Sequence, residues 1–367
     1  MTDGDALLRA VIANRDDDTP RLIYADWLDE NGQSERATFI RAQVEAARAE
    51  PFSPTARSAE NRADRLLKAH RKDWTRHLGS AIEEPGFQRG FIEHVGVEVQ
   101  PISISALSAL FEIEPLQTLK MVRFANADEL VDFLPVFELP QLQQLRQLKI
   151  VAVTGLIHDE YMALIQATHL LNIQKLSLRG NPIHPPWLVE MLNSNAFPNL
   201  IGLDVADIPN IGPALLSAFS KMTHREIKCL DASGVVLNSE QLQHLLTSRC
   251  LRTLEELRLC FSGLAGEAGP LFHLDIGWVI PWERLMLLDL NGQRLGDDAV
   301  RAIAFQDEAR SLRWLGLANN ALGPDAIRFL IETKHLTLNF LDVRGNRFTP
   351  MAISALKERF PDALILS

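Results

Sequence analysis

The sequence predicts an α/β repeat solenoid with a parallel sheet, preceded by a small all-α domain. A six-residue pattern with three aliphatic positions recurs about every 27 residues from Leu116 onward. Each copy is followed by a stretch with helical periodicity, whereas residues 1–80 show helical patterns without any copy of the unit. A single unit of this size cannot bury its apolar side chains, so stacked copies are expected to share one continuous core.

The composition narrows the class of protein. At 367 residues the chain exceeds the usual size of one hydrophobic core, and its formal net charge of −10 argues against a general binder of nucleic acid or anionic membranes. The three cysteines lack the spacing of a disulfide framework or a four-thiolate zinc site. The N-terminus is acidic, and no apolar run approaches the ~18 residues that span a bilayer. We therefore expect a cytoplasmic protein without a membrane segment.

Four helices are expected between residue 1 and about residue 78. Thr2 and Asp5 form a capping-box pattern ahead of the first helix, and the sequence Asp18-Thr19-Pro20 starts the second. Ser34 is expected to cap the third helix and Ser58 the fourth. Together these helices predict a small bundle.

The first half of this bundle resembles a known family. The stretch DDDTPRLIYADWLDENG, residues 16–32, and the following ERATFIRAQ, residues 35–43, are similar to the repeat-companion domain of planctomycete and some other environmental bacterial proteins. The likeness covers about residues 3–50. That family has no established activity and typically precedes leucine-rich repeats. The resemblance therefore implies a bacterial, intracellular interaction protein, without indicating a substrate.

The recurring pattern is L-x-x-L-x-L, and it defines nine repeats at spacings of 26 to 31 residues. All 27 of its aliphatic positions are apolar. The L-x-L step predicts a strand whose leucines point into the core while the alternate residues point outward. Helical patterns between the strands, several opening with proline, return the chain along the other side. The repeats begin at Leu116, Leu145, Ile173, Leu200, Ile227, Leu254, Leu285, Leu312 and Leu338.

Asparagines in the last repeats point to a specific repeat type. Asn320 and Asn346 stand eight residues after the first leucine of their repeats, as Asn181 does in an earlier one. These repeats are similar to ribonuclease-inhibitor-type leucine-rich repeats. The resemblance implies a right-handed horseshoe with a concave parallel sheet and convex helices, in which this asparagine bonds to backbone and links successive repeats. The ladder should be interrupted at the six repeats that carry Phe124, Val153, Ile208, Val235, Ser262 and Gln293.

Domain boundaries and caps complete the prediction. The segment from Gly79 to Gly90 is the expected linker between a helical domain, residues 1–80, and a repeat domain, residues 87–367. Residues 87–115 are expected to cap the array with a first, degenerate strand between Phe87 and Val97. A last strand at residues 363–366 should cap the other end.

No catalytic constellation is evident. The ten histidines are dispersed, without HExxH or a glycine-rich phosphate loop, so we expect no enzyme activity, no metal and no cofactor. His70 and His77, with Asp73 nearby, are a weak metal candidate, and satisfied histidines are the simpler interpretation. The acidic run at residues 16–18 is expected to support a helix start, and the three thiols to be inert. The basic stripe on the fourth helix is either a solvated face or a contact for an acidic partner.

The outward positions of the strands form the predicted binding surface. Trp314 and Phe340 occupy such positions on adjacent strands, where the core does not require them, and exposed aromatics are typical interface anchors. The alternative is that local structure covers them. The candidate contacts on this face are Lys149, Lys175, Arg179, Asp231, Arg258, Asp289, Trp314, Phe340, Asp342 and Arg344.

The longest repeat supplies a second candidate. Its segment from Phe272 to Trp282 carries Trp278 and Trp282 in a stretch too irregular for the usual helix. Either these residues meet a partner or they plug the convex side.

Taken together, the sequence predicts a non-catalytic module that binds a protein or peptide on its concave face, with no small-molecule substrate and no nucleic acid. Two alternatives remain open: a scaffolding or regulatory subunit whose N-terminal helices make the functional contact, and an enzyme with an unrecognised site.

Overall fold

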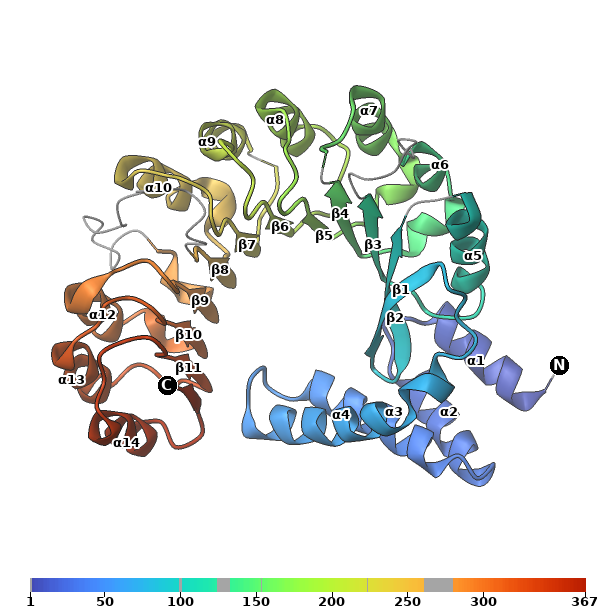
Figure 1. Ribbon diagram of the computed structural model, residues 1–367, viewed down its shortest axis with the longest axis horizontal. Helices are drawn as coiled ribbons and strands as arrows, with labels where there is room; N and C mark the ends of the chain where they lie inside the picture. Colours follow the sequence, from blue (N-terminus) through green and yellow to red (C-terminus); the bar gives the residue numbers. More distant parts are fainter. Residues whose placement is uncertain (1, 99–100, 124–132, 153, 223, 261–279) are drawn as a thin grey trace. The chain divides into compact units, whose positions relative to one another are not determined.

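The computed structural model describes residues 2–98, 101–123, 133–152, 154–222, 224–260 and 280–367. Within them the chain alternates strands and helices and divides into two compact units, Met1–Ile173 and Gln174–Ser367. In each unit the strands lie side by side in chain order (Figure 1). This is the arrangement expected of a repeat solenoid.

Unit 1 begins with four helices and continues into a four-stranded sheet. Strands β1 and β2 form an antiparallel hairpin, and β2, β3 and β4 are parallel. The helices before the sheet are α1 (Asp3–Ala13), α2 (Thr19–Glu30), α3 (Ser34–Arg48) and α4 (Pro54–Trp74). The remaining elements are β1 (Ile82–Gln88), β2 (Phe91–Glu98), α5 (Pro101–Phe111), β3 (Thr118–Arg123), α6 (Leu134–Phe137), η1 (Pro140–Gln144), β4 (Gln147–Ala152), α7 (His158–Gln166) and η2 (Thr168–Leu170).

The starts of α1 and α4 follow local capping chemistry, whereas α2 and α3 have no side-chain hydrogen bond at their N-caps, Asp18 and Gln33. Thr2 and Asp5 form the predicted capping box of α1. The prediction for α4 was wrong in position, because the helix begins at Pro54 rather than after Ser58. The Ser53 hydroxyl accepts a hydrogen bond from the N–H of Ala56 at 3.2 Å, and proline in the first turn lacks the N–H that would go unpaired there.

The expected linker is a strand. Residues Ile82–Gln88 form β1, and Arg89 and Gly90, with φ of 48° and 90°, make the two-residue turn into β2. The sequence did not reveal β1 because its register shifts between Glu83 and Gly86, which breaks the alternating pattern. The segment from Phe87 to Val97, expected as one strand, contains the end of β1, this turn and most of β2, and β2 pairs in parallel with β3.

The hairpin completes the core of the helices. Phe91 of β2 lies in one buried cluster with residues of α1, α2 and α3, and Phe87 of β1 packs against a second cluster from α3 and α4. The Arg36 guanidinium lies 4.8 Å from the ring centre of Trp74 and 5.3 Å from that of Phe87. The four helices therefore share their apolar interior with β1 and β2.

A buried ion pair also joins the helices to the hairpin. Nη2 of Arg21 on α2 lies 2.7 Å from Oε1 of Glu93 on β2, with side-chain exposures of 0% and 3%. Arg89 and Gln117 donate to the same carboxylate at 3.2 and 3.0 Å. Burial raises the pKa of Glu93 and lowers that of Arg21, while each charge favours the other. Removing one partner would leave the other charge buried and uncompensated.

We therefore expect Glu93→Gln to lower the free energy of unfolding by about 3 kcal/mol, because the isosteric amide leaves Arg21 charged in a buried site. Urea unfolding followed by circular dichroism measures the change. Glu83→Gln, on the exposed side of β1, is the matched control and should cost less than about 0.5 kcal/mol. Equal transitions for the two variants would contradict a role for the buried pair.

In its described residues, unit 2 is a series of strand–turn–helix repeats with eight parallel strands. Its strands are β5 (Lys175–Ser177), β6 (Gly202–Asp204), β7 (Cys229–Asp231), β8 (Glu256–Arg258), β9 (Leu287–Asp289), β10 (Trp314–Gly316), β11 (Phe340–Asp342) and β12 (Leu364–Leu366). Its helices are α8 (Pro185–Asn193), α9 (Gly212–Lys221), α10 (Ser239–Leu246), η3 (Arg249–Leu251), η4 (Trp282–Arg284), α12 (Gly296–Ala304), η5 (Ala309–Ser311), α13 (Pro324–Glu332) and α14 (Pro350–Arg359).

A single row of aliphatic side chains runs through the middle of this sheet. Leu176, Leu257 and Leu315 occupy equivalent places in their strands, each paired in register with an aliphatic neighbour. All 27 aliphatic positions of the predicted repeat pattern are buried, and the most exposed is Leu259 at 6%. The buried positions of the strands are those of the L-x-x-L-x-L pattern. The last strand of the sheet is β12, which pairs in parallel with β11.

The asparagine ladder links the last repeats, whereas Nδ2 of Asn181 donates to the carbonyl of Leu178 in its own repeat at 2.7 Å. Nδ2 of Asn320 donates to the carbonyl of Leu290 at 2.9 Å, and its Oδ1 accepts from the N–H of Gln293 at 2.9 Å. Asn346 repeats this one coil later, accepting from the N–H of Asn320 at 3.0 Å. The predicted interruption at Gln293 is wrong, because the longer side-chain amide of Gln293 donates to the carbonyl of Leu259 and so reaches the previous repeat. Phe124, Val153 and Ser262 lie outside the described residues.

Asn320→Ala should cost about 2–4 kcal/mol of unfolding free energy, because Asn320 is 0% exposed and its loss leaves buried backbone groups of two repeats unpaired. Chemical denaturation of the full chain checks this value. The exposed Asn195→Ala is the control and should stay within about 0.5 kcal/mol of the parent. A loss below about 1 kcal/mol for Asn320→Ala would refute the structural role of the ladder.

Candidate binding face

One side of the unit 2 sheet is open. In the described part of this unit the helices lie on the other side of the sheet (Figure 1), and the strand residues that alternate with the buried leucines form what we call the open face. Its first row, in register, is Lys175, Gly202, Cys229, Glu256, Leu287, Trp314, Phe340 and Leu364. Its second row is Ser177, Asp204, Asp231, Arg258, Asp289, Gly316, Asp342 and Leu366.

The two predicted aromatic anchors form a stacked pair in the first row. Trp314 and Phe340 are register partners on β10 and β11, with ring centres 4.8 Å apart and planes inclined by 4°. Both side chains are half-buried, so each shields one face of the other and keeps an edge toward solvent. Leu364, 43% exposed, continues this apolar strip at the next strand.

A glycine makes room for the indole. A Cβ atom on Gly316 would lie 2.8 Å from Cζ3 of Trp314 and 2.5 Å from Oδ1 of Asp289. The indole therefore extends over its own strand, and the Asp289 carboxylate approaches the same point from β9. The sequence signal for this arrangement is the glycine two residues after the tryptophan.

Asp342 and Arg344 form a two-pronged ion pair beside the aromatic pair. Nε and Nη2 of Arg344 lie 3.0 and 2.7 Å from the two carboxylate oxygens. The Asp342 side chain is 3% exposed and that of Arg344 is 59% exposed. Of the two, only the arginine is presented to a partner.

The aspartates of the second row also bond to their own backbone. Oδ1 of Asp204, Asp231, Asp289 and Asp342 each accepts from the N–H two residues further on, at 3.1, 3.0, 3.2 and 3.2 Å. Such a turn ends the strand and holds the carboxylate in place. The row of aspartates on this face thus has a structural role in each of these four repeats.

Arg179 neutralises the acids at the start of the unit. Its guanidinium lies 3.4 Å from Asp204, 2.9 Å from Asp207 and 2.5 Å from Asp231. Although burial opposes it, the three carboxylates raise the pKa of Arg179. The predicted contacts Arg179 and Asp231 are therefore partners of one another.

The remaining predicted residues are less closely grouped. Arg258 pairs with Glu256 on its own strand at 3.0 Å, and Lys175 is exposed at the first strand of unit 2. Lys149 belongs to unit 1, on β4, where it is the register partner of Lys120. Trp282 is 3% exposed in η4 and offers no surface to a partner, whereas Trp278 lies outside the described residues.

The described residues hold no set of three or more side chains that could ligate a metal. His70 stacks on Trp74, and Nε2 of His77 lies 3.0 Å from Glu114, so the two histidines have different partners.

Burial raises the pKa of Cys229 and Cys250 to about 11 and that of Cys260 to about 12, which keeps all three thiols protonated at neutral pH. Within the described residues no helix is both long and apolar enough to cross a bilayer.

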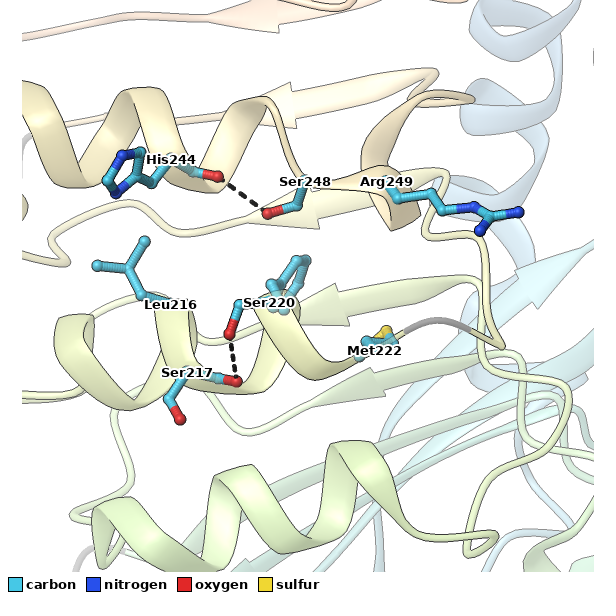
Figure 2. Close-up of a pocket in the computed structure, with 8 residues that line it drawn as sticks. Leu216, Ser217, Ser220, Met222, His244, Ser248 and Arg249 are labelled. Carbon is cyan, nitrogen blue, oxygen red and sulfur yellow. Dashed lines mark hydrogen bonds between the residues drawn. The ribbon is translucent and has the colours of Figure 1, made fainter.

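A cavity of about 460 Å³ lies on the helical side of unit 2, between α9 and α10 (Figure 2). Leu216, Phe219 and Met222 give it an apolar wall. The Ser220 and Ser248 hydroxyls at its edge donate to carbonyls of their own helices, both at 3.0 Å. The cavity is thus mainly a gap between packed helices.

Comparison with known proteins adds information on the fold. No protein-family model matches the chain, and no curated protein matches it in sequence. A chain of the yeast Rad7–Elc1 complex is similar in structure, with a TM-score of 0.55 and 14% identity over 93% of this chain and 89% of that chain. A Bacteroides fragilis protein covers 86% of this chain and 84% of its own at 16% identity, with a TM-score of 0.46. The first likeness supports a repeat solenoid fold and concerns the fold alone.

Gly316→Ala tests the position of the indole. The added methyl group would meet both Trp314 and Asp289, so we expect a loss of about 1–3 kcal/mol and a displaced indole. Urea unfolding and the ¹⁹F spectrum of protein labelled with 5-fluorotryptophan measure the two effects. Gly79→Ala, where the added Cβ has no neighbour within 4 Å, is the control. An unshifted Trp314 resonance would mean that the ring does not cover Gly316.

Proposed function

We propose that this chain is a non-catalytic protein-interaction module built on leucine-rich repeats of the ribonuclease-inhibitor type. It binds a protein or peptide on the open face of unit 2, with Trp314 and Phe340 as anchors. The observation that carries this proposal is the stacked pair itself: two large aromatic side chains half-exposed on a sheet face, on the opposite side from the buried leucine row.

The energetics of interfaces favour such a site. Truncating a central aromatic anchor typically costs 2 kcal/mol or more of binding free energy, roughly a thirtyfold loss of affinity. Two stacked rings offer a rigid apolar surface with little side-chain freedom left to lose on binding. Arg344 lies beside them as an exposed, oriented charge suited to the rim of an interface.

The structural comparison is consistent with this role. The yeast chain that shares the fold was found in a complex of Rad7 with Elc1, so a solenoid of this architecture occurs in a protein assembly. We extend only the class of function, protein binding, to this chain. The identity of the partner concerns the yeast protein alone.

The test replaces both anchors. Trp314→Ala combined with Phe340→Ala should reduce capture of a partner from a lysate of the source organism by at least about tenfold, while the thermal unfolding midpoint changes little. Quantitative mass spectrometry of captured proteins measures the loss. Phe305→Ala is the matched control, because Phe305 is an aromatic with 46% exposure on the helical side. Undiminished capture by the double variant would reject the open face as the binding site.

A second candidate surface lies on α4 in unit 1. Lys68 and Lys72 are exposed on this helix, and within the described residues no carboxylate lies at ion-pair distance from either. Because Phe87 and Phe91 belong to the core of the helices, separating residues 1–80 from the rest would open that core. Charge reversal of Lys68 and Lys72 in the full chain is therefore the appropriate comparison. Loss of capture in that variant alone would favour the N-terminal helices as the functional contact.

A further inference from the structure

One carboxylate of the open face differs from its neighbours in its charge partners. Arg179 binds Asp204 and Asp231, Arg344 binds Asp342, and Arg258 binds Glu256. Among the described residues, no basic group lies within ion-pair distance of Asp289. Arg258 is its register partner on β8, but the guanidinium of Arg258 is engaged 3.0 Å from Glu256.

The surroundings of Asp289 are partly apolar. Its side chain is half-buried, and its Oδ1 and the Trp314 indole both lie next to Gly316. Burial raises the pKa of this carboxyl group, while hydrogen bonds from Cys260 and the N–H of Asn291, together with the more distant charge of Arg258, favour the charged form. The result is a fixed carboxylate beside an aromatic ring.

A guanidinium group satisfies both features at once. It donates paired hydrogen bonds to a carboxylate, and the methylene stem that carries it can pack along the exposed edge of an indole. An ammonium group can do the first but matches the planar geometry less well. An anion is disfavoured, because the nearby bases Arg258 and Arg344 are already paired.

The strip next to this position is apolar. Phe340 follows Trp314 in the first row, and the partly exposed Leu364 follows Phe340. A partner peptide that places a basic side chain at Asp289 would therefore place the residues next to that side chain over an apolar surface.

We propose, on the basis of the proposed function, that the partner presents an arginine side chain that pairs with Asp289 against Trp314, with a neighbouring apolar side chain on Phe340 and Leu364. The partner is a peptide segment of arginine next to leucine or an aromatic residue. Asp289 supplies the selectivity for charge, and the aromatic pair supplies most of the affinity.

A random library of displayed 12-residue peptides, selected on the full chain, provides defined probes. We expect the enriched peptides to carry arginine beside an apolar residue. Synthetic copies are then titrated by calorimetry against the parent and variants, with citrulline replacing arginine as a neutral isostere. Citrulline should weaken binding to the parent by about tenfold or more. For Asp289→Asn, which keeps the acceptor for Asn291, the citrulline penalty should fall below about threefold.

Two further variants separate the possible failures. Trp314→Ala with Phe340→Ala should lose both arginine and citrulline peptides, and Asp298→Asn, an exposed carboxylate on α12, should behave like the parent. Peptides that need the aromatic pair but show the same citrulline penalty in Asp289→Asn would overturn this inference and leave the proposed function standing. Peptides indifferent to the aromatic pair would overturn both. Enrichment of peptides without arginine, or no enrichment at all, also overturns the inference.

Discussion

The structure depends on one constraint: an aliphatic side chain in the middle of each strand is buried only when the next repeat covers it. Leu203, Leu230 and Leu257 pair in register on consecutive strands and are at most 2% exposed. Backbone pairing between parallel strands then follows at the same register, and the alternate residues are forced to the opposite side of the sheet. The open face is thus a by-product of how the core is built, and the aliphatic requirement of the core does not apply to its residues.

Features governed by periodicity could be predicted from the sequence. The repeat starts, the buried aliphatic positions and the closing strand β12 all follow from a pattern of 27 apolar positions, because burial demands the same residue type at every copy. The asparagine ladder could be predicted from a resemblance. The strand β1 could not, since its register shift removes the alternation on which strand prediction rests.

The candidate site was harder to predict, because it depends on which side chains meet across strands. The sequence placed Trp314 and Phe340 outward on adjacent strands, and the structure adds that they stack. It could not indicate that Arg179 binds three carboxylates, or that Asp342 is buried beneath Arg344, since these contacts depend on side-chain direction. Because many charged groups of the open face pair with one another, its formal charges overstate the charge that is available to a partner.

The asparagine ladder has a consequence for the aromatic pair. Asn320 and Asn346 join the turns of the repeats that contain β9, β10 and β11, and these strands carry Asp289, Trp314 and Phe340. These hydrogen bonds between turns restrict sliding of one repeat past the next, so the strands that carry the two rings are held rigidly. A surface that already has its bound geometry loses less conformational entropy when a ligand binds to it. Rigidity that arose from internal hydrogen bonding thereby becomes an asset for recognition.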